Sequence, residues 1–160
     1  MPKRQIFYSF DFENDVSRVE MIRNIGALED NKPVSVDEWE EVKKKGEPAI
    51  EKWIDNNMSH RSCVVVLIGE RTANRKWIKY EIKKAWREGK GLLGVYIHNI
   101  ECPSNGKGIK GNNPFARFTI SGGTRVLEVV KCYNPDPNDA CKSIKENLET
   151  WVENAIKARQ

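Results

Sequence analysis

One carboxylate lies inside a predicted apolar helical stripe, and it is the residue best placed for chemistry. On a wheel of about 100° per residue, Glu81 falls between Trp77 and Ala85. A carboxylate in such a stripe is costly unless it is paired, hydrogen-bonded or turned toward a cleft. Two interpretations follow: Glu81 is a functional carboxylate at a cleft, or it forms a structural ion pair with Arg71 or Arg75.

Acidic residues also follow the first apolar run, where residues 11–15 read Asp-Phe-Glu-Asn-Asp. Phosphate-binding loops need glycines and backbone N–H groups, and three carboxylates would repel a phosphate. This excludes a Rossmann or P-loop cradle and a flavodoxin-type phosphate loop. A phospho-acceptor receiver domain is disfavoured too, because it needs an aspartate at the end of its third strand. Residues 68–71 read Ile-Gly-Glu-Arg at that place.

Short apolar runs without polar alternation predict strands buried on both faces, which is typical of parallel sheets. The predicted strands are residues 6–10, 63–68, 92–97 and 126–130, with a short edge strand at 33–36. Helical patterns separate them, so we expect an α/β fold: flavodoxin-like, three-layered, with a mostly parallel sheet of about five strands. In this order the first strand neighbours the 63–68 strand, and ligands bind at the carboxyl edge.

Helix signals complete this pattern. The predicted helices begin at Asn14 or Asp15, near Trp39, at Pro48 and at Thr72 or Asn74, and the last contains Ile144–Ile156. The predicted strand over residues 92–97 leads into a long connection over residues 99–124, which is rich in Gly, Asn and Lys. Connections this long inside a domain are more often functional or mobile than idle.

Length and composition describe an ordinary globular domain. The chain has 160 residues, 39% hydrophobic and 31% charged, with a net charge of +4. We expect one domain over residues 1–160, located in the cytoplasm, because no apolar run approaches the roughly 18 residues of a membrane span and the start does not resemble a signal peptide. The excess positive charge is mild and lies largely on outer helix faces, so neither a membrane nor nucleic acid is expected as a partner.

The cysteines predict no metal site. Cys63, Cys102, Cys132 and Cys141 form no C-x-x-C pair, and the chain has two histidines. Structural zinc is therefore not expected, and the cysteines are interpreted as reduced.

Several segments together carry a resemblance to a known family. The chain resembles TIR (Toll/interleukin-1 receptor) domains at residues 7–10, at residues 64–69 and in the pattern Arg75-x-Trp77-x-x-x-Glu81. The likeness is most specific over residues 72–82, where the chain is similar to the TIR-like branch that includes ThsB of Thoeris anti-phage defence. Residues 89–97 and 112–115 extend it, so that it spans about residues 3–115.

This resemblance implies an enzyme that cleaves the nicotinamide–ribose bond of NAD. In the Thoeris branch it further implies a cyclic ADP-ribose product that activates a separate effector protein. Glu81 matches the catalytic glutamate of the family. The candidate substrate-binding residues are Phe10, Asp11, Trp77, His98 and Asn112. Each also has a structural interpretation, as core for the aromatic residues and as turn or cap for Asp11. NAD is then a substrate, and neither a cofactor nor a metal is expected.

The sequence also departs from the family, and a second function stays open. Ile78 stands where many TIR domains have a small residue or Cys, and residues 26–38 correspond loosely to the loop that gates other TIR sites. The alternative function is a non-catalytic scaffold that acts through TIR–TIR assembly. Self-association is expected under both functions. A buried carboxylate favours the enzyme, because a scaffold has no need of one.

Overall fold

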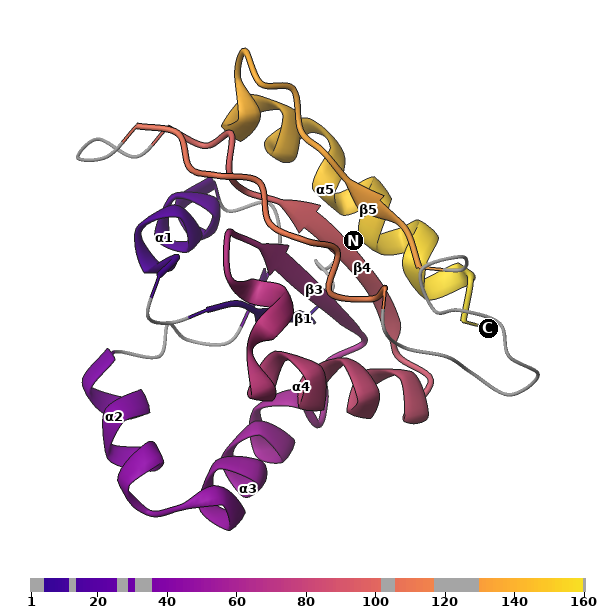
Figure 1. Cartoon of the computed structure of the whole chain (residues 1–160). Coiled ribbons are helices and arrows are strands. Elements are labelled where there is room, and N and C mark those ends of the chain that lie inside the picture. Colours follow the sequence, from indigo (N-terminus) through magenta and orange to yellow (C-terminus); the bar gives the residue numbers. More distant parts are fainter. Residues whose placement is uncertain are drawn as a thin grey trace.

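A parallel sheet of five strands forms the centre of the described part of the chain (Figure 1). The computed structural model describes residues 5–11, 14–25, 29–30, 36–101, 106–116 and 130–159. The strands are β1 (Gln5–Ser9), β2 (Glu29–Asp30), β3 (Cys63–Ile68), β4 (Gly91–Tyr96) and β5 (Cys132–Tyr133). Their order is β2-β1-β3-β4-β5 and every pair is parallel. The predicted fold class and the pairing of the first strand with 63–68 are confirmed.

Two predicted strands differ from the structure. The predicted strand over 126–130 lies outside the described residues except for Val130, which is not in a strand, and the strand that follows it is Cys132–Tyr133. The edge strand is Glu29–Asp30, and the prediction of a strand over 33–36 is wrong at its described end, because Val36 begins a helix. The β-branched valines of residues 33–36 suggested a strand, but the amphipathic pattern that continues from Val36 through Trp39 favours a helix.

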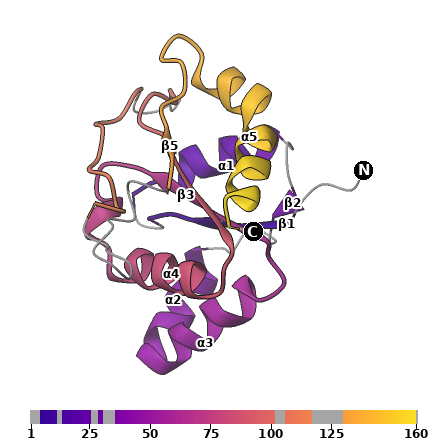
Figure 2. The same cartoon turned by 90° about the vertical axis from the view of Figure 1, so that its right-hand side faces the viewer.

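Helices cover both faces of the sheet, as predicted for strands without polar alternation. The helices are α1 (Val16–Ile25), α2 (Val36–Lys44), α3 (Glu47–Met58), α4 (Lys76–Arg87) and α5 (Ala140–Lys157), with a 3₁₀ turn η1 (Thr72–Asn74) before α4. Figure 2 shows α1 and α5 on one side of the sheet and α2, α3 and α4 on the other. All six residues of β3 are buried. Cys63, Val65 and Leu67 pack toward α1 and α5, while Val64, Val66 and Ile68 pack toward α2, α3 and α4.

The predicted helix from Thr72 or Asn74 to about Gly89 is divided in the structure. The η1 turn ends at Asn74, and Arg75 has extended backbone angles (φ −81°, ψ 127°) before α4 begins. The Thr72 hydroxyl holds the turn, because it accepts a hydrogen bond of 2.8 Å from the backbone N–H of Gly69. This break places the Arg75 side chain at the first turn of α4, beside the end of β1.

Gly111 lies where the β4–β5 connection meets the end of β3. A Cβ on Gly111 would overlap the carbonyl oxygen of Gly69. We expect Gly111→Ala to lower the free energy of unfolding by about 1–3 kcal/mol, because one of two backbone segments must move. Urea unfolding measures this, with Ile109→Ala as control, since the Ile109 side chain is 65% exposed. Equal stability of the two variants would contradict the close approach.

No helix among the described residues is long and apolar enough to cross a membrane.

Candidate functional site

A cavity at the carboxyl ends of β1 and β3 brings together four of the six predicted site residues. Its volume is about 170 Å³. The lining residues are Phe10, Asp11, Trp39, Lys43, Arg75, Lys76, Trp77 and Glu81. Phe10 and Asp11 follow β1, and the last four begin α4, the helix after β3. This is the edge at which ligands bind in open α/β sheets, between the two strands where the order reverses.

Glu81 is buried on the sheet side of α4, as the helical wheel predicted. It is 7% exposed, and Ile78, Ile82 and Ala85 beside it are fully or almost fully buried. Its Oε2 atom has no hydrogen-bond partner among the described residues. Burial raises the pKa of Glu81 to about 8. A buried carboxyl with an unpartnered oxygen, facing a cavity, is the arrangement expected of a group that meets its partner in a ligand.

Ser9, on β1, has a side chain that affects the pKa of the Glu81 carboxyl. Ser9 is 1% exposed and shares its sheet face with Phe7, which packs toward α4. Its hydroxyl lowers the pKa of Glu81 slightly, against the larger effect of burial. Ser9 Oγ nevertheless makes no hydrogen bond of normal geometry within the described residues. The Ser9 hydroxyl therefore lies near the Glu81 carboxyl but leaves its Oε2 atom without a hydrogen bond among the described residues.

Asp11 pairs with the two arginines that the sequence suggested as partners of Glu81. Its side chain is 2% exposed, and its Oδ2 accepts a 3.1 Å hydrogen bond from Arg75 Nε. Arg71 Nε lies 3.8 Å from the same oxygen, and Arg71 Nη2 donates to Asn14 Oδ1 at 3.1 Å. The sequence suggested that Arg71 or Arg75 forms an ion pair with Glu81, but the ion pairs of both arginines in the described part of the chain are made with Asp11. The Asp11 carboxylate at this cavity is therefore paired with guanidinium groups.

Asp15 is a third buried carboxyl at this edge, and the sequence predicted it only as a helix cap. Its backbone carbonyl accepts from Val19 N, which confirms the cap. Its side chain packs against Gly69, where a Cβ would overlap the carboxylate. Burial raises the pKa of Asp15 to about 6, and Oδ2 has no hydrogen-bond partner in the described part of the chain. Asp15 does not line the cavity that contains Glu81.

Aromatic rings form two walls of the Glu81 cavity. Trp77 is partly buried, packs edge-on against Tyr80 at 5.5 Å between ring centroids, and still lines the cavity. Trp39, which comes from α2, is 8% exposed and lies 5.4 Å from the Trp53 ring. Trp39 is not among the site residues predicted from the sequence. In the sequence it is an aromatic residue in a short amphipathic helix, and this pattern does not show against which element the helix packs.

His98 and Asn112 are placed away from the cavity that contains Glu81. His98 follows β4, its ring lies 6.2 Å from the Tyr96 ring, and burial lowers its pKa. Asn112 lines a separate cavity of about 530 Å³ with Asn113, Lys79 and Lys83. The structure therefore groups Phe10, Asp11 and Trp77 with Glu81, and leaves these two predicted residues outside the group.

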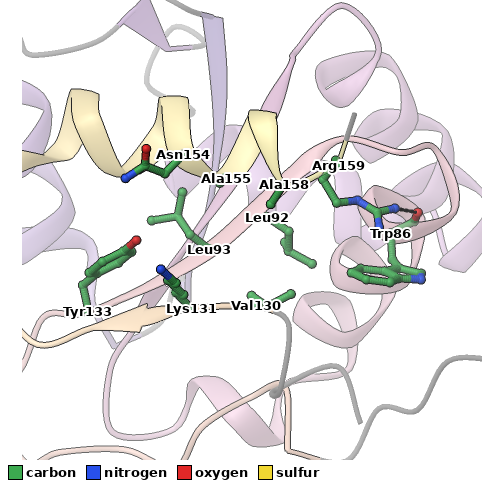
Figure 3. A pocket seen from close by; sticks show the side chains of 10 residues that line it. All are labelled: Trp86, Leu92, Leu93, Val130, Lys131, Tyr133, Asn154, Ala155, Ala158 and Arg159. Atoms are coloured by element: carbon green, nitrogen blue, oxygen red, sulfur yellow. Dashed lines mark hydrogen bonds between the residues drawn. The ribbon is translucent and has the colours of Figure 1, made fainter. Parts of the chain in front are cut away.

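A third cavity, of about 230 Å³, lies at the opposite edge of the sheet (Figure 3). It lies between the start of β4 and the ends of α4 and α5. The Arg159 guanidinium lies 3.7 Å from the centroid of the Trp86 ring, and its Nη2 donates to the Trp86 carbonyl at 2.6 Å. Arg159 Nε also donates to the Lys90 carbonyl. These contacts join the end of α5 to the end of α4, so this arginine has a structural role here.

The described residues contain no cluster of three or more His, Cys, Asp or Glu side chains suited to a metal ion. Cys63 and Cys132 are reduced, and burial raises the pKa of each thiol to about 12. Cys141 is reduced as well, and Cys102 lies outside the described residues. The described lining of the Glu81 cavity offers two carboxyl groups, three aromatic rings and three cationic side chains.

Comparison with known proteins places these features in one family. Residues 7–101 match the family model of the TIR-like domain of the Thoeris protein ThsB. The chain is also 30% identical over 117 residues to a protein of Bacillus cereus (strain MSX-D12) named "Putative cyclic ADP-D-ribose synthase ThsB1". That match covers 70% of this chain and 61% of the relative. The family match contains the last three residues of β1, all of β3 and α4, and the described lining of the Glu81 cavity, and the chain belongs to the ThsB family of TIR-like domains.

Proposed function

We propose that this chain cleaves the nicotinamide–ribose bond of NAD and releases a cyclic ADP-ribose as a signal in anti-phage defence. The observation that carries the proposal is the buried Glu81 carboxyl, whose Oε2 has no partner among the described residues and which faces a cavity with aromatic walls. The similarity to a protein named as a cyclic ADP-D-ribose synthase supports the choice of product class. Self-association and a separate effector chain that binds the product belong to the same proposal.

The reaction needs little from the protein beyond one well-placed negative charge. When the C1′–N bond breaks, its electron pair goes to the pyridinium nitrogen, so nicotinamide leaves as a neutral molecule without a proton donor. The ribose carbon becomes oxocarbenium-like, as in glycoside hydrolysis. The ionised Glu81 carboxylate stabilises this developing cation and accepts hydrogen bonds from the ribose hydroxyls. An atom elsewhere in the same ADP-ribose then uses its lone pair to form a bond to C1′ and close the ring, and water in its place gives linear ADP-ribose. When the attacking atom is an oxygen, its proton passes to the Glu81 carboxylate and from there to solvent.

The aromatic residues supply the remaining requirements of the step. Trp77 and Phe10 offer apolar surface on which the nicotinamide ring can stack, and Trp39 closes the side formed by α2. A cavity with two indole walls also limits the water near C1′, which favours ring closure over hydrolysis. In this account the catalytic residue is Glu81, and the aromatic residues bind and orient the substrate.

The test is incubation of the protein with NAD, followed by chromatographic separation of nicotinamide, linear ADP-ribose and cyclic products. The proposal predicts release of nicotinamide together with a cyclic product. The incubation is repeated with a crowding agent and with phage lysate, because an enzyme that works as an assembly or a sensor can need either. NAD that stays intact under all three conditions, while the protein self-associates, would support the scaffold function instead.

A further inference from the structure

The Glu81 cavity is too small for a whole dinucleotide and has charges of opposite sign. Its volume of about 170 Å³ is below the roughly 300–1,000 Å³ of pockets that enclose a complete small ligand. Glu81 and Asp11 are its acidic lining residues, and Arg75, Lys76 and Lys43 supply positive charge. A dinucleotide whose ribosyl-nicotinamide fills the cavity must therefore extend past these cations with its diphosphate.

Arg75 differs from the two lysines in how it is held. Lys43 pairs with Glu40 at 2.9 Å and Lys76 pairs with Glu47, and both glutamates are exposed. Arg75 pairs instead with the carboxylate of Asp11, which is 2% exposed. An ion pair with a buried partner of fixed position restricts the arginine more than an exposed pair restricts a lysine. Arg75 is 34% exposed and lines the cavity, so its guanidinium is both oriented and accessible.

The surroundings of Arg75 favour an anion. Asp11 alone would repel a phosphate, but Arg75 and Arg71 both approach the same carboxylate oxygen, Arg71 at 3.8 Å, and their charges offset that of Asp11. Arg75 is also the N-cap residue of α4, and its side chain makes no capping hydrogen bond. The positive end of the helix dipole adds to the charge of the guanidinium at this place.

From this arrangement we infer that Arg75, oriented by the buried Asp11 carboxylate, binds the diphosphate of the dinucleotide whose ribose lies at Glu81. The inference rests on the proposed function for the identity of the substrate. It gives Asp11 a positioning role: Asp11 acts through Arg75 and does not bind the ribose hydroxyls. The planar fork of arginine N–H donors suits the oxygens of a diphosphate.

The test compares two substrates that share the scissile bond. NAD carries the diphosphate, and nicotinamide riboside carries no phosphate. Arg75→Gln is expected to lower kcat/KM for NAD about ten-fold or more, through loss of a charge-assisted hydrogen bond, and to change it less than two-fold for nicotinamide riboside. Arg87→Gln is the matched control, because Arg87 is an exposed arginine in the last turn of the same helix and does not line the cavity. It should leave both substrates nearly unchanged.

Two further variants separate positioning from folding. Asp11→Asn is expected to raise KM for NAD several-fold with little change in kcat, and to spare nicotinamide riboside. Arg75→Lys should recover part of the loss with NAD, because it restores the charge but not the planar fork. Retained cleavage of nicotinamide riboside shows that each variant is folded. Equal losses on both substrates, or no loss with NAD, would overturn the inference.

Calorimetric titration with ADP-ribose separates this inference from the proposed function. ADP-ribose keeps the diphosphate and lacks nicotinamide, so its binding requires no turnover. If the unmodified protein cleaves neither substrate, the proposed function fails and the titration decides alone. Affinity about ten-fold weaker in Arg75→Gln than in Arg87→Gln would support the diphosphate site. Equal affinity in the two variants, or no binding to the unmodified protein, would refute it.

Discussion

Glu81→Gln is expected to reduce nicotinamide release from NAD by about 10²- to 10³-fold, the usual effect of removing one electrostatic contact to a transition state. Glutamine keeps the size and shape of the side chain but cannot carry the negative charge that faces the oxocarbenium-like ribose. Glu81→Asp keeps the charge and draws it back by one methylene, so its loss should be smaller. The measurement is the initial rate of nicotinamide release at pH 8.5.

The control for this prediction is a glutamate of the same charge at a distant place. Glu149 is exposed on α5, on the opposite side of the sheet from α4. Glu149→Gln should release nicotinamide at the rate of the unmodified protein. Binding of ADP-ribose by Glu81→Gln, measured in the same preparation, shows that the site is folded. Full activity of Glu81→Gln would contradict the catalytic role assigned here.

Glu81→Gln is also expected to change how stability depends on pH. Burial raises the pKa of Glu81 in the folded protein from 4.5 to about 8. The folded state therefore holds this proton more tightly than the unfolded state. The stability that the neutral carboxyl contributes is complete below about pH 4.5, and it is lost as the pH rises through about 8. The loss amounts to a few kcal/mol, on the order of 1.4 kcal/mol for each tenfold change in proton affinity.

Glutamine does not titrate, so the variant should lack this loss. Urea unfolding at pH 5.5, 7 and 8.5 should show the unmodified protein losing stability faster than Glu81→Gln as the pH rises. Asp15, whose pKa is raised to about 6, is present in both proteins and cancels in the comparison. The slopes are compared rather than single values, because a buried amide has its own hydrogen-bonding cost. Parallel curves would mean that Glu81 titrates at its ordinary pKa.

The features that could be predicted from the sequence depend on local periodicity. The wheel over α4 placed Glu81 in the apolar stripe because side-chain direction along one helix follows from spacing alone. The runs at 63–68 and 92–97 predicted buried parallel strands for the same reason. From that strand order, the carboxyl edge of β1 and β3 followed as the place where Phe10, Asp11 and Glu81 meet.

The features that could not be predicted depend on contacts between distant segments. Arg75 and Asp11 are 64 positions apart, and no local pattern decides which carboxylate the arginine meets. Trp39 reaches the cavity because α2 packs against α3 and joins the same core cluster as α4, and no local pattern determines this. His98 was expected near Glu81 because both follow sheet strands, but His98 follows β4, one strand farther from β1.

The most direct test of the central claim uses the unmodified protein: the pH dependence of kcat/KM for nicotinamide release from NAD. This profile reports the titration of groups in the free enzyme. If the ionised Glu81 carboxylate stabilises the ribosyl cation, kcat/KM should rise with pH and level off above an apparent pKa near 8. The pKa of His98 is lowered, so its titration lies well below that range. A profile that is flat from pH 6 to 9, or that falls through pH 8, would contradict the claim.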